Sequence, residues 1–225
     1  MECNPYAVKP VERRTAPVWT ALDDHLLHSV RVVHDLMRGR LSERPPVPTT
    51  APLVPGELSL AVGPASRHTW RALGNGSYRH DNTVAFGSPA FVLLNLATSA
   101  LGNANRKSRA RADAQPRWVT DGHGMLTVTN RRAFLGQERG YLDLNWSGLT
   151  SVDLAGPDVF QCSFHVTHTG GYRTVQLHTP WASLMFALAA HSTFPAHPRL
   201  TSGGWLPPDF EARCAAVGAH CPNVR

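Results

Sequence analysis

The run VFQCSFHVTHTGGYRTVQLHTPWASLMFALAA, residues 159–190, contains the change of periodicity that decides the fold. Apolar and polar residues alternate strictly over Val159–Val166, which is the period of a strand with one buried face. Gly170-Gly171 then turns the chain into a second alternating run, Tyr172–His178. From Pro180 the apolar spacing becomes helical, with Trp181, Leu184, Met185 and Leu188 on one face. The stretch predicts a β-hairpin followed by a helix that covers the open end of a sheet.

Short apolar runs divided by turn residues extend this pattern upstream and predict an antiparallel barrel or sandwich. The expected strands are Leu58–Val62, Thr83–Phe86, Met125–Thr129, Ala133–Leu135, Tyr141–Trp146 and Leu149–Leu154. Turn signals stand at Gly74-Asn75-Gly76 and at Asn130-Arg131. The predicted core residues are Trp146, Phe160, Phe164, Leu177, Trp181 and Leu184.

An amphipathic helix is predicted between Pro17 and Arg38, with Thr15 near its start and Gly39 as its stop. Its apolar stripe is Trp19, Leu22, Leu26, Val30, Val33 and Met37, and Asp23 belongs to the opposite, polar face. A segment with five prolines follows and predicts a linker. The expected organisation is a helical extension (1–41), a Pro-rich linker (42–56), a β-barrel with a helical insertion and a capping helix (57–192), and a C-terminal tail (193–225).

The longest run without charge, from Thr83 up to Arg106, which ends it, is long enough to span a membrane, but its composition is too polar. A strand, a turn at Gly87-Ser88-Pro89 and a buried helix fit it better. A membrane-associated segment is the alternative.

The chain has a formal net charge of +6 and a pI of about 9.6, carried almost entirely by arginine. Such an excess favours anionic partners: nucleic acid, an acidic protein or a membrane surface. A composition biased by GC-rich codons, with few lysines and abundant alanine, glycine and proline, is the preferred explanation of the excess.

The four cysteines, Cys3, Cys162, Cys214 and Cys221, form no CxxC pair. Cys214 and Cys221 with His220 would supply part of a zinc site, but a second ligand pair is missing from the sequence. The first eleven residues have no apolar core of a signal peptide. We therefore expect no metal, reduced thiols and a cytoplasmic location, with a peripheral position at the membrane as an extension of it.

Motifs of the common hydrolases and phosphoryl-transfer enzymes are absent: G-x-S-x-G, G-x-x-x-x-G-K-[ST], H-E-x-x-H and G-x-G-x-x-G do not occur in the sequence. The twelve histidines are expected to be solvated or satisfied in the core, including His25 and His28 on one helix face. We expect no catalytic residue and no cofactor.

One basic cluster is the candidate anion-binding site. It comprises Arg106, Lys107, Arg109, Arg111 and Arg117, opposed by Asp113, with Arg131 and Arg132 in the next hairpin turn as possible additions. Arginine forks suit phosphate groups. A solvated loop is the alternative interpretation. Aromatic residues are missing between Asn103 and Arg117, which disfavours nucleic acid.

The segment GMLTVTNRRAFLG, residues 124–136, resembles the G-x-L-x-V-T-N-x-R-L-x-F hairpin of bacterial PH-like and GRAM-like proteins, apart from Ala133, where a larger aliphatic residue is usual. VQLHTPWASLMFALAA (175–190) resembles their last strand and C-terminal helix. GSPAFVLLNLATSALGNANRKSRARA (87–112) resembles an insertion of actinobacterial proteins of this kind. The resemblance implies a partly open antiparallel β-barrel with a capping helix that binds lipid headgroups, peptides or partner domains.

Three functions follow from these observations. The first is a non-catalytic intracellular binding module of PH-like type, for a protein partner or an anionic membrane surface. The second is a structural or regulatory protein with no small ligand. The third is an enzyme whose site the sequence does not reveal.

Overall fold

The computed structural model describes residues 18–73, 108–109, 112–166 and 170–225. Its main feature is one antiparallel sheet of seven strands in the order β4-β3-β2-β1-β7-β6-β5. The mainly β architecture with helices that the sequence predicts is confirmed at this level. The strands are β1 (Ser59–Arg71), β2 (Arg117–Thr129), β3 (Arg132–Gln137), β4 (Gly140–Asn145), β5 (Leu149–Gly156), β6 (Val159–Val166) and β7 (Gly171–His178).

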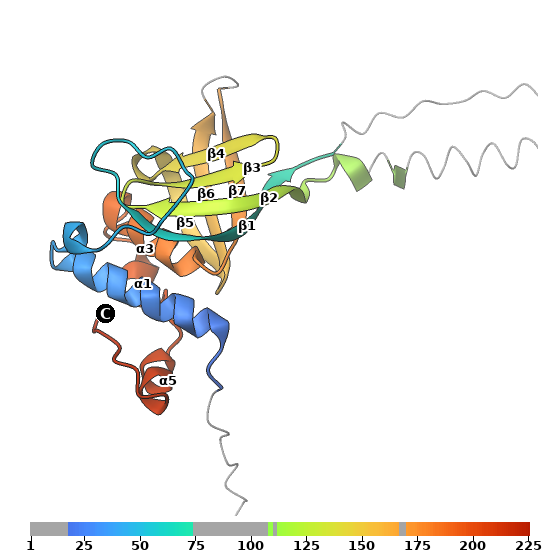
Figure 1. The fold of residues 1–225 in the computed structure, drawn as a ribbon. Helices are drawn as coiled ribbons and strands as arrows, with labels where there is room; N and C mark the ends of the chain where they lie inside the picture. Colours follow the sequence, from blue (N-terminus) through green and yellow to red (C-terminus); the bar gives the residue numbers. More distant parts are fainter. Residues whose placement is uncertain (1–17, 74–107, 110–111, 167–169) are drawn as a thin grey trace, which may run out of the picture.

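The sheet folds over itself with β1 shared between its two halves, and it stays open because the end strands β4 and β5 do not pair with each other. In Figure 1, β2–β4 cross β6 and β7 at a steep angle. β1 pairs with β2 over Ser59–Arg71, but with β7 only over Ser66–Thr69. The first half of β1 therefore presents an edge that none of the described strands covers.

Most predicted strands lie where the sequence places them, and β6 has the predicted bounds. The first strand was predicted too short, since β1 continues past Val62 through Gly63 and Pro64 to Arg71. β2 likewise begins at Arg117 and continues through Gly122, where φ is +130°. The predicted strand Thr83–Phe86, the Gly74–Gly76 turn and the helix that follows lie outside the described residues.

Helix α1 (Ala21–Met37) lies within the predicted interval but begins differently. The capping residue is Thr20, whose backbone N–H and hydroxyl both donate to the Asp23 carboxylate at 2.8 and 2.7 Å. Asp23 was placed on the solvent face, but it is buried. Gly39, with φ of +67°, follows the helix as predicted. Met37, expected in the apolar stripe, is exposed.

Helix α3 (Ala182–Thr193) is buried on every side, whereas the sequence was interpreted as one apolar face. Each residue from Ala182 to Ala190 is buried. One side of α3 contacts β5 and β6, and another contacts α1. A helix that is apolar all round requires such complete coverage.

The segment after α3 supplies part of this coverage. It contains the short helices α4 (Pro198–Thr201) and α5 (Phe210–Ala216). Trp205 and Phe210 are buried in the same core as α3. Arg213 on α5 forms an ion pair of 2.6 Å with the buried Asp23 carboxylate, which ties this segment to α1.

The Pro-rich segment is attached to the sheet. Val47 N–H donates to the Ser59 carbonyl at 2.9 Å, and the Thr49 and Thr127 hydroxyls are 2.6 Å apart. A 3₁₀ turn, η1 (Leu41–Glu43), precedes it, and a second, η2 (Trp146–Gly148), joins β4 to β5. The domain boundaries themselves stay a prediction.

Four of the six predicted core residues are buried, namely Trp146, Phe160, Leu177 and Leu184. Phe164 and Trp181 are partly buried against that core. Phe164 lies near the end of β6, opposite Arg173 of β7. Trp181 lies just before α3 and donates from its indole nitrogen to the Val62 carbonyl at 3.1 Å.

We expect Phe160→Ala to lower the free energy of unfolding by about 3–5 kcal/mol, because a fully buried ring leaves a cavity. Phe164→Ala on the same strand is the matched control and should cost clearly less. Urea denaturation of both variants measures this. Equal losses of unfolding free energy in the two variants would contradict the assignment of Phe160 as more deeply buried than Phe164.

Candidate functional site

A polar pocket lies where β1, β2 and the β6–β7 hairpin meet, at the end of the sheet opposite Ser59. Its cavity measures about 380 Å³. We call it the arginine pocket. Its lining residues are Arg67, Thr69, Trp70, Arg71, Asp121, Tyr172 and Arg173.

Strand alternation brings three of these side chains to one face. Ala61 and Ala65 of β1 are buried on the inward face of the sheet. Side chains two residues apart share a face, so Arg67, Thr69 and Arg71 continue that face beyond the apolar core.

A bulge in β2 places the acidic partner. The pairing of β1 with β2 shifts between Arg67 and His68, so that Asp121 has no direct partner across the strands. Such an extra residue re-aims the side chains around it. Thr69 donates a short hydrogen bond to Asp121, and Arg71 Nη2 lies 2.7 Å from Asp121 Oδ1.

The pocket carries more positive than negative charge. Arg67, Arg71 and Arg173 face the single carboxylate of Asp121, an excess of two positive charges. Arg67 Nε is buried, lies 3.7 Å from Asp121 Oδ2 and has no hydrogen-bond acceptor among the described residues. Burial lowers the pKa of Arg67, and the charges of Arg173 and Arg71 lower it further against the opposing effect of Asp121. An anion in the pocket would supply the missing acceptor.

Exposed aromatic side chains border the arginine pocket. Tyr172 is 76% exposed and Trp70 is 50% exposed. The Trp118 ring meets Trp70 edge-on, with centroids 5.3 Å apart, and Leu73 beyond them is also exposed. This end of the sheet therefore joins a positive pocket to an amphipathic rim.

The predicted basic cluster is only partly described. Arg106, Lys107 and Arg111 lie outside the described residues, and Arg109 is exposed. Arg117 is paired with Asp113 at 3.0 Å. Arg117 begins β2 and Arg131 follows its end, so the length of a 13-residue strand, about 40 Å when extended, separates them. The structure therefore does not bring Arg131 and Arg132 beside Arg117.

Arg132 holds the fold together. Its Nε donates to Glu57 at 2.8 Å, and its other nitrogens contact Asp143 and the Pro52 carbonyl. These carboxylates raise the pKa of Arg132, the Glu57 hydrogen bond having the largest effect. Arg132 would have to give up these contacts in order to bind a phosphate group. Arg131 is exposed.

His25 and His28 make structural contacts, and the described cysteines are unpaired. His28 Nε2 bonds the Leu60 carbonyl at 2.9 Å, and the rings of His25 and His28 both pack edge-on against Trp181. Cys162, Cys214 and Cys221 are free thiols, and Cys3 lies outside the described residues. Within the described ranges, no three His, Cys, Asp or Glu side chains gather closely enough to hold a metal ion.

The sequence interpretation missed the arginine pocket. The sequence pattern that could have revealed the pocket is Arg67-x-Thr69-x-Arg71, because residues two positions apart lie on the same face of a strand. The predicted first strand ends at Val62, before this spacing begins, whereas β1 continues to Arg71. Tyr172 and Arg173 were recognised as strand residues without a role.

Comparison with known proteins adds no relative: no protein-family model and no curated protein matches this sequence. Among the helices of the described part, none combines the length and the apolar composition needed to cross a membrane.

We expect Arg132→Met to lower the free energy of unfolding by about 3 kcal/mol, because Glu57 would remain buried without its cation. Arg131→Met removes a neighbouring exposed charge and should stay within about 0.5 kcal/mol of the parent protein. Thermal or urea unfolding measures both. A binding defect in a fully stable Arg132→Met protein would contradict the structural role.

The stability lost in Arg132→Met should depend on pH, which urea unfolding at several pH values measures. Burial raises the pKa of Glu57, but the hydrogen bonds from Arg132, Val54 N–H and Thr129 bring it below its ordinary value. This stabilisation is present above the ordinary pKa of glutamate and disappears as the pH falls through the folded value. The difference in stability between the parent and Arg132→Met should therefore shrink in acid.

Proposed function

We propose that this protein is a non-catalytic, PH-like binding module whose arginine pocket binds the phosphate-bearing headgroups of an anionic membrane surface. The observation that carries the proposal is the gathering of Arg67, Arg71 and Arg173 around one carboxylate, beside exposed aromatic rings. The family assignment rests on the resemblance of the hairpin and the last helix and on the strand topology.

The chemistry of the pocket suits a phosphate. Guanidinium groups bind phosphate oxygens through paired hydrogen bonds, and they lose less hydration than an ammonium group does. Tryptophan and tyrosine favour the headgroup level of a bilayer, where one end of the ring is wet and the other is apolar. Trp70 and Tyr172 are placed to enter that level while the arginines contact phosphates.

The topology supports the PH-like assignment. A seven-stranded antiparallel sheet whose first strand serves both halves is followed directly by helix α3. Residues 74–116, which include most of the predicted basic cluster, join β1 to β2 at the end of the sheet that bears the arginine pocket. Both basic elements are therefore attached to the same pair of strands.

Replacing Arg67, Arg71 and Arg173 together by Gln should weaken binding to vesicles of phosphatidylcholine and phosphatidylserine about a hundredfold. Each basic side chain near an anionic bilayer contributes about 1 kcal/mol. Co-sedimentation at low ionic strength measures the binding, and salt should weaken it for the parent protein.

The matched control carries Arg31→Gln, Arg38→Gln and Arg40→Gln, three exposed arginines in or directly after α1. It loses the same net charge and should bind nearly as the parent does. Equal binding by the pocket variant and this control would mean that the net charge of the protein, and not the arginine pocket, determines vesicle binding. No binding by the parent protein would refute the membrane proposal and favour a protein partner.

The sequence-predicted cluster is tested separately with Arg106→Ala, Lys107→Ala, Arg109→Ala and Arg111→Ala in one protein. We expect a partial loss of vesicle binding that adds to the loss from the pocket variant. An unchanged affinity would mean that this segment is a solvated connection.

A further inference from the structure

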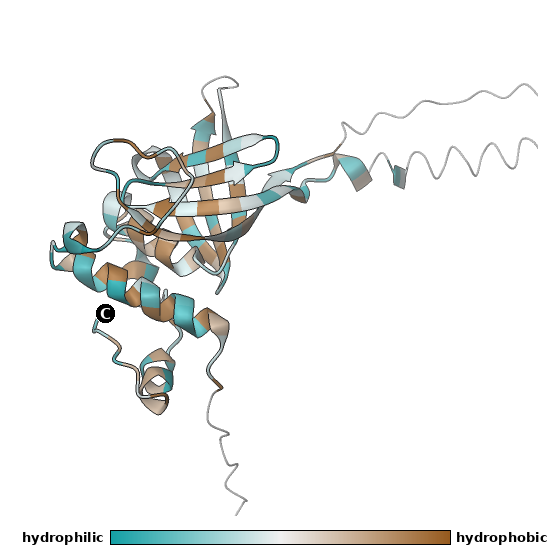
Figure 2. Ribbon diagram, in the orientation of Figure 1, coloured by the Kyte–Doolittle hydropathy of each residue, from teal (hydrophilic) through white to brown (hydrophobic). Residues whose placement is uncertain are grey.

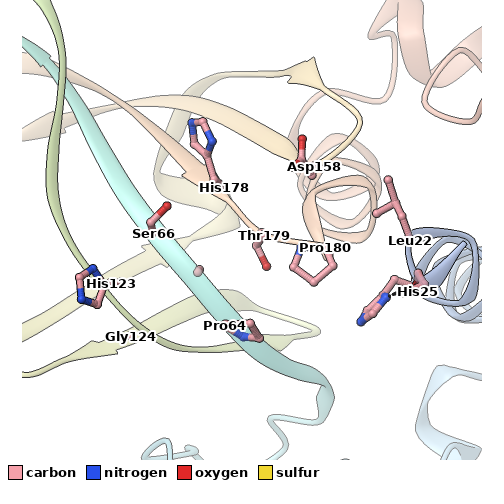
Figure 3. A pocket seen from close by; sticks show the side chains of 12 residues that line it. Leu22, His25, Pro64, Ser66, His123, Gly124, Asp158, His178, Thr179 and Pro180 are labelled. Atoms are coloured by element: carbon pink, nitrogen blue, oxygen red, sulfur yellow. Dashed lines mark hydrogen bonds between the residues drawn. The ribbon is translucent and has the colours of Figure 1, made fainter.

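A second cavity lies on the opposite, outer side of β1, between the sheet and the first turn of α1. Its volume is about 790 Å³, within the range of small-molecule sites. We call it the histidine groove. The lining comes from α1, β1, β2, the β5–β6 turn and the β7–α3 connection, as Figure 3 shows.

The histidine groove exists because the first half of β1 has no strand on its β7 side. Two of its edge carbonyls are taken by side chains: Leu60 O accepts from His28, and Val62 O accepts from Trp181. Pro64, which lines the groove, has no backbone N–H. This edge is protected against an added strand, so an extended peptide would not gain the usual ladder of hydrogen bonds.

One end of the groove is polar. His123, Ser66 and His178 stand opposite one another on β2, β1 and β7, so they form one row across three adjacent strands. Side chains at directly paired positions lie about 5 Å apart. His68 supports the row, since its ring packs on His178 with centroids 4.1 Å apart and its Nε2 lies 3.1 Å from Ser66 Oγ.

The other end is apolar. Leu22 faces the β7–α3 connection from α1, with Pro180 and Pro64 across the space (Figure 3). His25 lies there too, with its ring edge-on to Trp181. Imidazole and hydroxyl groups can donate hydrogen bonds at the first end. Asp158 is the one carboxylate in the lining, against three imidazoles.

We propose that the histidine groove binds a small amphiphilic carboxylic acid. The carboxylate accepts hydrogen bonds from His123, Ser66 and His178, and the hydrocarbon body lies on Leu22, Pro64 and Pro180. A carboxylate is a strong acceptor for the N–H and O–H groups that this row offers. Because Ser66 and Arg67 point to opposite faces of β1, this site is separate from the arginine pocket and does not rest on the function proposed for it.

The test uses decanoate, with 1-decanol as the uncharged ligand of the same length, by isothermal titration calorimetry below the micelle concentration. Decanoate should bind the full-length chain saturably, and 1-decanol at least about tenfold more weakly, because the charge-assisted hydrogen bonds are lost. His123→Ala should weaken decanoate and leave 1-decanol nearly unchanged. His123 is exposed, so this variant is expected to fold.

Ala21→Trp fills the apolar end from the exposed start of α1 and should weaken both ligands about tenfold or more. Ala215→Trp, an exposed alanine of α5, is the matched control and should bind both normally. The Arg67, Arg71 and Arg173 variant should also retain decanoate, so the two proposals can fail independently. Absence of saturable binding, or normal binding by Ala21→Trp, would overturn this proposal.

Discussion

The complete burial of α3 is the constraint on which the rest of this structure depends. Nine consecutive residues without a charge, Ala182–Ala190, leave the helix no face that water can cover. The sheet covers one side, and its open form leaves the other side bare. Figure 2 shows bands of apolar residues along α1. Of these residues, Leu26, Val30 and Val33 are buried in the same core as α3. The N-terminal helix and the C-terminal segment therefore complete the core of the sheet domain.

Two buried polar contacts fix these covering elements in place. Asp23 closes the first turn of α1 and pairs with Arg213, so α1 and α5 share one carboxylate. His28 and Trp181 bring α1 and α3 to the edge of β1, where each satisfies a carbonyl that no strand reaches. A barrel with an unpaired edge would otherwise expose that edge to other chains. Gly63 permits the approach, since a Cβ there would lie 2.6 Å from the Trp181 indole nitrogen.

The sequence predicted what depends on local periodicity. The alternation over Val159–Val166 gave the bounds of β6, and the helical spacing after Pro180 placed α3. It failed where tertiary contacts decide: Asp23 has the chemistry of a surface residue and is buried because Arg213, 190 positions later, faces it. The continuation of β1 through Gly63-Pro64 depends on pairing with a distant strand. The arginine pocket was missed for the same reason, because a bulge in β2 brings Asp121 to Arg67.

The distribution of ion pairs separates the arginines that hold the fold from those that are available to a ligand. Arg132 meets two carboxylates and a carbonyl, and Arg213 meets Asp23 and Asp209, so each of these cations has more than one charge partner. In the arginine pocket the arginines outnumber the carboxylates instead, because three guanidinium groups share Asp121 alone. A buried Arg67 Nε without an acceptor lowers stability, and a pocket serving only the fold would gain from a second carboxylate or an apolar substitute. The three arginines lie at the open end of the sheet, beside exposed aromatic rings. An anion bound from outside the protein would balance their charge and accept a hydrogen bond from Arg67 Nε.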